Sequence, residues 1–139
     1  MIVTRDEVRV GVTPLCAYEH LVHFSEYPSF MSAILFTEAA GHGGHLTFDI
    51  GGRRVEANVE LSDTEPGRFV RWRSEALTES FWLHEAGDHV TDIAAMTELD
   101  DVLIPLFDAS PEAMLHERLH MNLKGFKRFC EEHEHSFEA

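Results

Sequence analysis

Hydrophobic and polar residues alternate along most of residues 2–99, as they do in strands that bury one face. Breaks rich in glycine, proline or aspartate separate the alternating runs. The pattern predicts strands at residues 2–12, 34–39, 46–50, 55–62, 70–74, 78–85 and 89–99. Because the later runs follow one another through short connections, we expect an antiparallel meander.

Gly51-Gly52 separates two of these runs and predicts a tight hairpin. A type I′ turn needs positive φ at both central residues, which glycine adopts without strain. Such a turn also fixes which residues lie opposite one another. The expected pairs are Leu46 with Ala57, Phe48 with Val55, and Asp49 with Arg54, the last a favourable charge pair.

Two short helical segments are expected between the first two strands. Thr13 can cap a helix that begins at Pro14, where the missing N–H of proline costs nothing. Apolar residues continue at helical spacing to about Phe24. A second brief turn, which Ser25 can cap, is expected to run through Met31.

The end of the chain predicts a long amphipathic helix, with Ser110 as its cap and Pro111 at its first position. Its apolar stripe has spacings of three and four and consists of Leu115, Leu119, Leu123, Phe126 and Cys130. Gly125 lowers helix propensity, so we interpret it as a place where the helix packs closely against the sheet.

These elements predict an α+β fold, in which a curved seven-stranded antiparallel sheet is covered on one face by the C-terminal helix. No other predicted element is large enough to cover a sheet of that width. If the sheet curves around the helix, a space lined by apolar side chains can remain between them. Such a space is suited to bind a small molecule.

Composition narrows the classes of protein. The 139 residues carry a formal net charge of −14, which repels phosphate backbones and argues against nucleic acid as a partner. No apolar run has the length of a membrane span, and the N-terminus lacks the pattern of a signal peptide. Cys16 and Cys130 predict buried thiols in a reducing compartment. We therefore expect a cytoplasmic protein with a single domain over residues 1–139, a monomer or homodimer, without metal or cofactor.

Five segments together carry a resemblance to a known superfamily. They are Thr13-Pro14, FSEYPSFM at 24–31, EPGRFVRWRS at 65–74, SFWLHE at 80–85 and the helical residues 117–129. They resemble the polyketide cyclase/dehydrase (aromatase/cyclase) branch of the START / Bet v 1-like (SRPBCC) superfamily, over nearly the whole chain. The resemblance implies the helix-grip fold, with an apolar cavity beneath the C-terminal helix.

Two functions follow from this resemblance. One is a polyketide cyclase or aromatase, of the kind used in antibiotic biosynthesis, that holds a hydrophobic polyketide-type chain and assists its cyclisation or dehydration. The other is a non-catalytic carrier or sensor of a lipid, quinone or polyketide. Enzymes of this branch often place an arginine on the strand that matches residues 53–62. The inward positions expected here are instead Val55, Ala57, Val59 and Leu61, which favours the carrier.

The candidates for proton transfer are His84, Tyr27, Ser74 and Asn122. Tyr27 has a phenol suited to general acid work, and Asn122 lies beside the helix stripe, where it could bind a ligand carbonyl. Each has a structural alternative: a packed tyrosine with its hydroxyl at the surface, a serine bonded to nearby backbone, or a satisfied core amide.

His84 is the most natural proton shuttle if it faces the cavity, because the usual pKa of histidine is about 6.5. Trp82 has the same parity on its strand and would face the same way. Phe81 and Leu83 could equally be the inward pair, which would leave His84 in solvent. The sequence leaves both arrangements open.

The wall of the cavity is expected to consist of apolar side chains that suit a hydrophobic small-molecule ligand. They are Phe30, Met31, Phe36, Phe48, Val59, Trp72, Trp82, Leu119, Leu123 and Phe126. The alternative is that these residues simply fill the core.

A zinc-peptidase pattern, H-E-x-x-H, is present at residues 116–120. The longer form of the motif would need glycine and histidine at positions that Leu123 and Phe126 occupy. We therefore interpret His116 and His120 as residues that flank the buried stripe.

Overall fold

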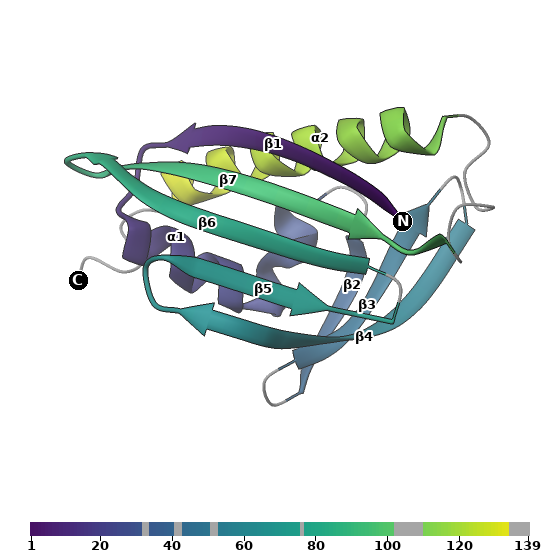
Figure 1. Ribbon diagram of the computed structural model, residues 1–139. Coiled ribbons are helices and arrows are strands. Elements are labelled where there is room, and N and C mark those ends of the chain that lie inside the picture. Colours follow the sequence, from purple (N-terminus) through teal and green to yellow (C-terminus); the bar gives the residue numbers. More distant parts are fainter. Residues whose placement is uncertain (32–33, 41–42, 51–52, 76, 102–109, 134–139) are drawn as a thin grey trace.

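The computed structural model describes residues 1–31, 34–40, 43–50, 53–75, 77–101 and 110–133 (Figure 1). Its elements are β1 (Ile2–Val10), α1 (Pro14–Val22), the 3₁₀ helix η1 (Phe24–Ser29), β2 (Ile34–Ala40), β3 (Gly43–Ile50), β4 (Arg53–Glu65), β5 (Phe69–Arg73), β6 (Leu77–Gly87), β7 (Val90–Leu99) and α2 (Pro111–Glu132). Every predicted element is present, with ends that shift by a few residues.

The strands described form one seven-stranded antiparallel sheet in the order β1-β7-β6-β5-β4-β3-β2. The last six strands form the expected meander, and β1 joins its far edge beside β7. In Figure 1 the sheet bends across its width, and α2 lies behind it along β1 and β7. The predicted α+β helix-grip architecture is confirmed.

The hairpin register between β3 and β4 is the one expected from the sequence. Its partners include Leu46 with Ala57, Phe48 with Val55, and Asp49 with Arg54. The two glycines of the turn lie outside the described residues. β4 continues as far as Glu65, with a shift of register between Leu61 and Asp63.

Both predicted helix caps, Thr13 and Ser110, are present. The Thr13 hydroxyl accepts a hydrogen bond from Cys16 N at 3.2 Å, and the Ser110 hydroxyl accepts one from Ala113 N at 3.4 Å. α1 ends at Val22, earlier than expected, and the chain continues directly into η1.

α2 is attached to β1 and to the residue that follows it. In the first half of the helix, His116 Nδ1 lies 2.9 Å from the Thr4 hydroxyl, and His120 Nδ1 lies 2.8 Å from Asp6 Oδ2. Near the end of the helix, Glu131 accepts a hydrogen bond at 2.8 Å from the backbone N–H of Gly11, just after β1. These contacts hold the helix against one edge of the sheet.

Gly125 marks a close approach, but its neighbour is not the sheet that we expected. A Cβ added at this glycine would lie 2.1 Å from the carbonyl oxygen of Phe30, directly after η1. The absence of a side chain therefore lets α2 pass against the backbone that leads out of η1.

Side-chain burial settles the orientation of β6. Phe81 and Leu83 are buried, whereas Trp82 and His84 are exposed. The arrangement that we left open is therefore the one with His84 outside, and the interpretation of Trp82 as a cavity residue is wrong. In the described part of the chain, no helix is long and apolar enough to cross a membrane.

Candidate functional site

Four buried residues form a row across the inner face of the sheet. The register places Trp72 of β5 opposite Glu79 of β6, Glu79 opposite Thr97 of β7, and Thr97 opposite Thr4 of β1. Their exposed fractions are 0%, 1%, 0% and 9%. A carboxyl group therefore lies in the middle of a surface that packs beneath α2.

Glu79 is held by one of its two oxygens. Its Oε1 accepts hydrogen bonds from the Thr97 hydroxyl at 3.2 Å and from Arg118 Nη1 of α2 at 3.3 Å. Its Oε2 is buried and has no hydrogen-bond partner among the described residues. The carboxyl is therefore fixed in orientation, with one oxygen left for another group.

Burial raises the pKa of Glu79, because removal from water disfavours the charged form. The positive charge of Arg118 and the hydrogen bonds from Thr97 and Arg118 oppose that effect without cancelling it. Such a carboxyl takes up a proton more readily than an exposed one, which is the property of a group that carries out acid–base chemistry.

Asn122 lies one helical turn after Arg118, on the same face of α2. It is 1% exposed, and neither its amide nitrogen nor its oxygen has a hydrogen-bond partner in the described ranges. The other buried residues of this helix are apolar or sulfur-containing: Leu115, Leu119, Leu123, Phe126 and Cys130. Asn122 is thus a polar exception on an apolar face, and the alternative of a satisfied core amide is not the arrangement among the described residues.

Tyr27 is fully buried, so the alternative of a hydroxyl at the surface is wrong. The hydroxyl donates a hydrogen bond to the carbonyl of Leu21. Burial raises the pKa of Tyr27 well above its ordinary value, and the negative charge of Glu79 adds to this, while a hydrogen bond with Trp72 acts in the opposite direction. The phenol therefore stays protonated next to the row of polar residues.

Most of the expected wall residues belong to the buried core. They are Phe30, Met31, Val59, Trp72, Leu119, Leu123 and Phe126. The Phe30 ring contacts those of Tyr27 and Phe126, with centroids 5.1 and 5.0 Å apart. The side chains of Phe36 and Phe48 lie outside the described part of the structure. That any of these residues touches a ligand stays a prediction.

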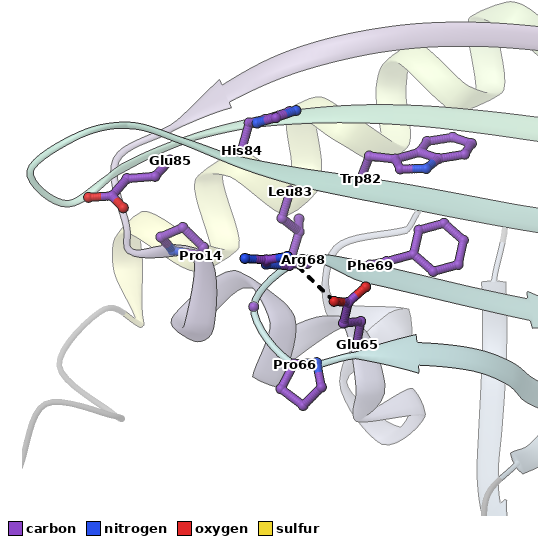
Figure 2. A pocket seen from close by; sticks show the side chains of 10 residues that line it. Pro14, Glu65, Pro66, Arg68, Phe69, Trp82, Leu83, His84 and Glu85 are labelled. Atoms are coloured by element: carbon purple, nitrogen blue, oxygen red, sulfur yellow. Dashed lines mark ion pairs between the residues drawn. The ribbon is translucent and has the colours of Figure 1, made fainter.

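A groove of about 790 Å³ surrounds the turn between β4 and β5 (Figure 2). We call it the outer groove because the exposed Trp82 and His84 line it, although Pro14 of α1 and the buried Leu83 also belong to its lining. Its lining includes the exposed Trp82, packed on Phe69 with ring centroids 5.4 Å apart, and the ion pair of Arg68 with Glu65. His84 lines this groove and a neighbouring one of about 440 Å³ that extends to β1.

Two predicted proton-transfer residues are thus separated from the interior. His84 faces the outer groove because the alternation of β6 turns Phe81 and Leu83 inward. Ser74 lies just after β5 and closes the turn to β6. Its hydroxyl donates to the Leu77 carbonyl at 3.2 Å and accepts from Leu77 N at 3.1 Å. The structural alternative for Ser74, a bond to nearby backbone, is the arrangement observed.

The two histidines of the H-E-x-x-H pattern bind β1. His116 contacts Thr4 and His120 contacts Asp6. Burial tends to raise the pKa of Asp6, but hydrogen bonds from His120 and the backbone of Glu7, with the electrostatic effect of His120 and His116, outweigh it and lower the pKa. Within the described ranges, no group of three or more His, Cys, Asp or Glu side chains could hold a metal ion.

Cys16 and Cys130 are buried thiols, as expected. Burial is the main cause that raises the pKa of Cys130, so this thiol stays protonated and is a poor nucleophile.

Sequence reasoning missed Glu79 and Arg118. Glu79 has the same parity as Phe81 and Leu83, so it points inward in the arrangement that we had left open. Arg118 precedes Asn122 by one helical turn. The signal was a charged residue in phase with the buried residues of each element. Only the packing of α2 on the sheet shows that the two charges meet.

No protein-family model and no curated protein matches the chain, but solved structures do. A START superfamily protein from Mycobacterium smegmatis has a TM-score of 0.77 at 13% identity, over 94% of this chain and 97% of that one. The Zhui aromatase/cyclase from Streptomyces sp. R1128 has a TM-score of 0.75 at 13% identity, over 94% of each chain. A protein from Deinococcus radiodurans has a TM-score of 0.69 at 20% identity, over 97% of this chain and 99% of that one. The chain thus has the START-like fold, which an aromatase/cyclase shares.

Proposed function

We propose that the protein binds a hydrophobic, polyketide-type small molecule between α2 and the sheet, and that it assists cyclisation or dehydration of that molecule. One observation carries the proposal: Glu79 and Asn122 are buried at 1% exposure, with polar atoms that no described residue satisfies. Buried polar groups in proteins are normally hydrogen-bonded, and unsatisfied ones concentrate at functional sites. A ligand in the interior supplies the missing partners.

The chemistry of ring closure needs a group that moves protons. A base removes a proton from the carbon between two carbonyls, the resulting enolate attacks another carbonyl, and the new alkoxide takes up a proton. Glu79 is suited to both transfers, because burial raises its pKa above the ordinary value and its Oε2 is left for a ligand. Arg118 keeps the charge of the carboxyl balanced.

Tyr27 and Asn122 have supporting roles in this scheme. Asn122 can hold a carbonyl of the substrate, and the protonated phenol of Tyr27 limits the interior on the side of η1. The apolar core residues around them position the chain, which contributes by orientation more than by chemistry. His84 has no part in it, because it faces the outer groove.

A synthetic linear poly-β-ketone thioester tests the enzyme directly. We expect the protein to change the ratio of cyclised and dehydrated products from the spontaneous ratio, and Glu79→Gln to abolish that change. Glu85→Gln is the matched control, because Glu85 is exposed at the outer groove. A product ratio that the wild-type protein leaves unchanged would contradict catalysis.

The second candidate, a carrier or sensor, is favoured by the apolar or small side chains at inward positions of β4, such as Ala57 and Val59, where the cyclase branch often has an arginine. A carrier would bind the same thioester stoichiometrically, slow its spontaneous reaction and leave the product ratio unchanged. Native mass spectrometry of the mixture distinguishes this outcome from the absence of binding.

A further inference from the structure

The interior presents an unusual pair of hydrogen-bonding groups to a ligand. The side-chain amide of Asn122 has a donor and an acceptor on neighbouring atoms, both buried and both without partners among the residues described. Leucine has the same branched shape as asparagine, with two methyl groups in place of the amide oxygen and nitrogen, and would present no unsatisfied polar atoms on this apolar face. The amide therefore weakens the folded state unless another molecule binds it.

The charges nearby limit what that molecule can carry. Arg118, one helical turn from Asn122, forms an ion pair with Glu79 of β6, and 11% and 1% of the two side chains are exposed. Their charges balance each other inside the protein. A ligand with a net charge would disturb this balance in surroundings where an unpaired charge is costly. A neutral group fits.

We infer that the interior ligand carries a neutral head group with a hydrogen-bond donor and an acceptor on adjacent positions, and that Asn122 binds this edge. Primary amides and protonated carboxylic acids share this arrangement. The inference rests on the proposed function, because it requires that the interior admits the apolar body of the ligand. It adds the chemical class of the head group and the residue that selects it.

Three naphthalene probes with the same apolar body test the inference by calorimetric titration. Naphthalene has no head group, methyl 2-naphthoate has acceptors only, and 2-naphthamide has the donor beside the acceptor. We expect the wild-type protein to bind 2-naphthamide about tenfold more tightly than the ester, since one added buried hydrogen bond contributes roughly that factor. Asn122→Leu should remove this preference and leave naphthalene binding within about twofold.

Thermal unfolding of the same variant gives an independent readout. Asn122→Leu should unfold at a higher temperature than the wild-type protein without ligand, because it removes unsatisfied polar atoms from the core. Met121→Leu is the matched control, because Met121 is exposed on the same helix, and all three affinities should stay unchanged. If Asn122→Leu fails to fold, Asn122→Ala replaces it in the titrations.

The outcomes separate the two proposals. Equal affinity of the wild-type protein for the amide and the ester, with naphthalene still bound, overturns the head-group inference and leaves interior binding intact. A preference that persists in the Asn122 variant, or a variant with a lowered unfolding temperature, also overturns it, because the amide would then have a partner within the protein. Failure of all three probes to bind overturns the proposed function and this inference with it.

Discussion

Glu79 of β6 and Arg118 of α2 form an ion pair beneath the C-terminal helix, with 3.3 Å between Oε1 and Nη1. The carboxyl side chain is 1% exposed, so the pair connects the helix to the middle of the sheet through groups removed from water. A buried ion pair contributes little net stability, because desolvation offsets the attraction. Net stability therefore does not account for the presence of this pair, which is consistent with the acid–base role proposed for Glu79.

The first prediction concerns the pH dependence of Glu79. Burial raises the pKa of Glu79 in the folded protein above its value in the unfolded chain. The stability that it contributes is therefore fully present below the unfolded pKa and is lost as pH rises through the folded pKa. Glutamine does not titrate, so the difference in Tm, wild type minus Glu79→Gln, should fall as pH rises from about 4 to about 8.

Calorimetric Tm values across that pH range check the sign. A difference that grows with pH would mean that attraction to Arg118 exceeds the cost of burial, and that the pKa of Glu79 is lowered. Arg118→Met provides the control. This variant removes the positive charge that pairs with Glu79. It should therefore destabilise the protein by about 3–5 kcal/mol near neutral pH and by less in acid, where Glu79 is protonated.

The sheet could be predicted from the sequence where a turn fixed its register. Gly51-Gly52 predicts a two-residue turn, and a turn of known length fixes which residues of β3 and β4 lie opposite one another. The alternation on both sides agrees with that register. The long helix was equally clear, because an apolar stripe runs from Leu115 to Cys130 within its 22 residues and a cap precedes its start. Local chemistry and periodicity agree in both elements.

The orientation of β6 could not be predicted, because both of its faces carry large apolar residues. Phe81 is buried in the core, while Trp82 packs on Phe69 outside the sheet. Only the pairing with neighbouring strands decides which face is covered. The same ambiguity hid Glu79, whose partner Arg118 is 39 residues away and meets it only when the helix lies on the sheet.

A second pH prediction has the opposite sign. Hydrogen bonds from His120 and the backbone of Glu7, with the electrostatic effect of His120 and His116, outweigh burial and lower the pKa of Asp6 in the folded protein. Stability from Asp6 is therefore present above its unfolded pKa and is lost as pH falls through the folded pKa. The Tm of the wild type minus that of Asp6→Asn should shrink as pH falls below about 4.

Circular dichroism melts of both proteins between acidic and neutral pH check this prediction. The double variant Asp6→Asn/His120→Asn tests whether His120 is the cause of the lowered pKa. At neutral pH, Asp6→Asn should change Tm less when His120 is already replaced by asparagine than in the wild-type protein. An equal effect in both backgrounds would show that Asp6 does not act through His120.

His84 gives a third prediction, which follows from its place on the outer face. His84→Ala should change the free energy of unfolding by no more than about 0.5 kcal/mol, as usual for an exposed residue. Calorimetric affinity for naphthalene should also stay at the wild-type value, because the side chain lines the outer grooves. A marked loss of naphthalene affinity would place the binding site on the outer face. Trp82→Ala would then lose it too, since Trp82 lines the same groove.

The contact between Gly125 and Phe30 gives the last prediction, in which two physical effects compete. Alanine would favour the helix by about 1 kcal/mol relative to glycine. Its Cβ, however, would lie 2.1 Å from the Phe30 carbonyl oxygen, and a backbone atom cannot rotate away as a side chain can. Overpacking of this kind typically costs about 1–3 kcal/mol, so we expect Gly125→Ala to lower the free energy of unfolding in urea titrations. Lys124→Ala, on the exposed side of α2, should stay within about 0.5 kcal/mol of the wild type. A more stable Gly125→Ala protein would show that α2 can move away from η1, and the interior would then be wider than the contact implies.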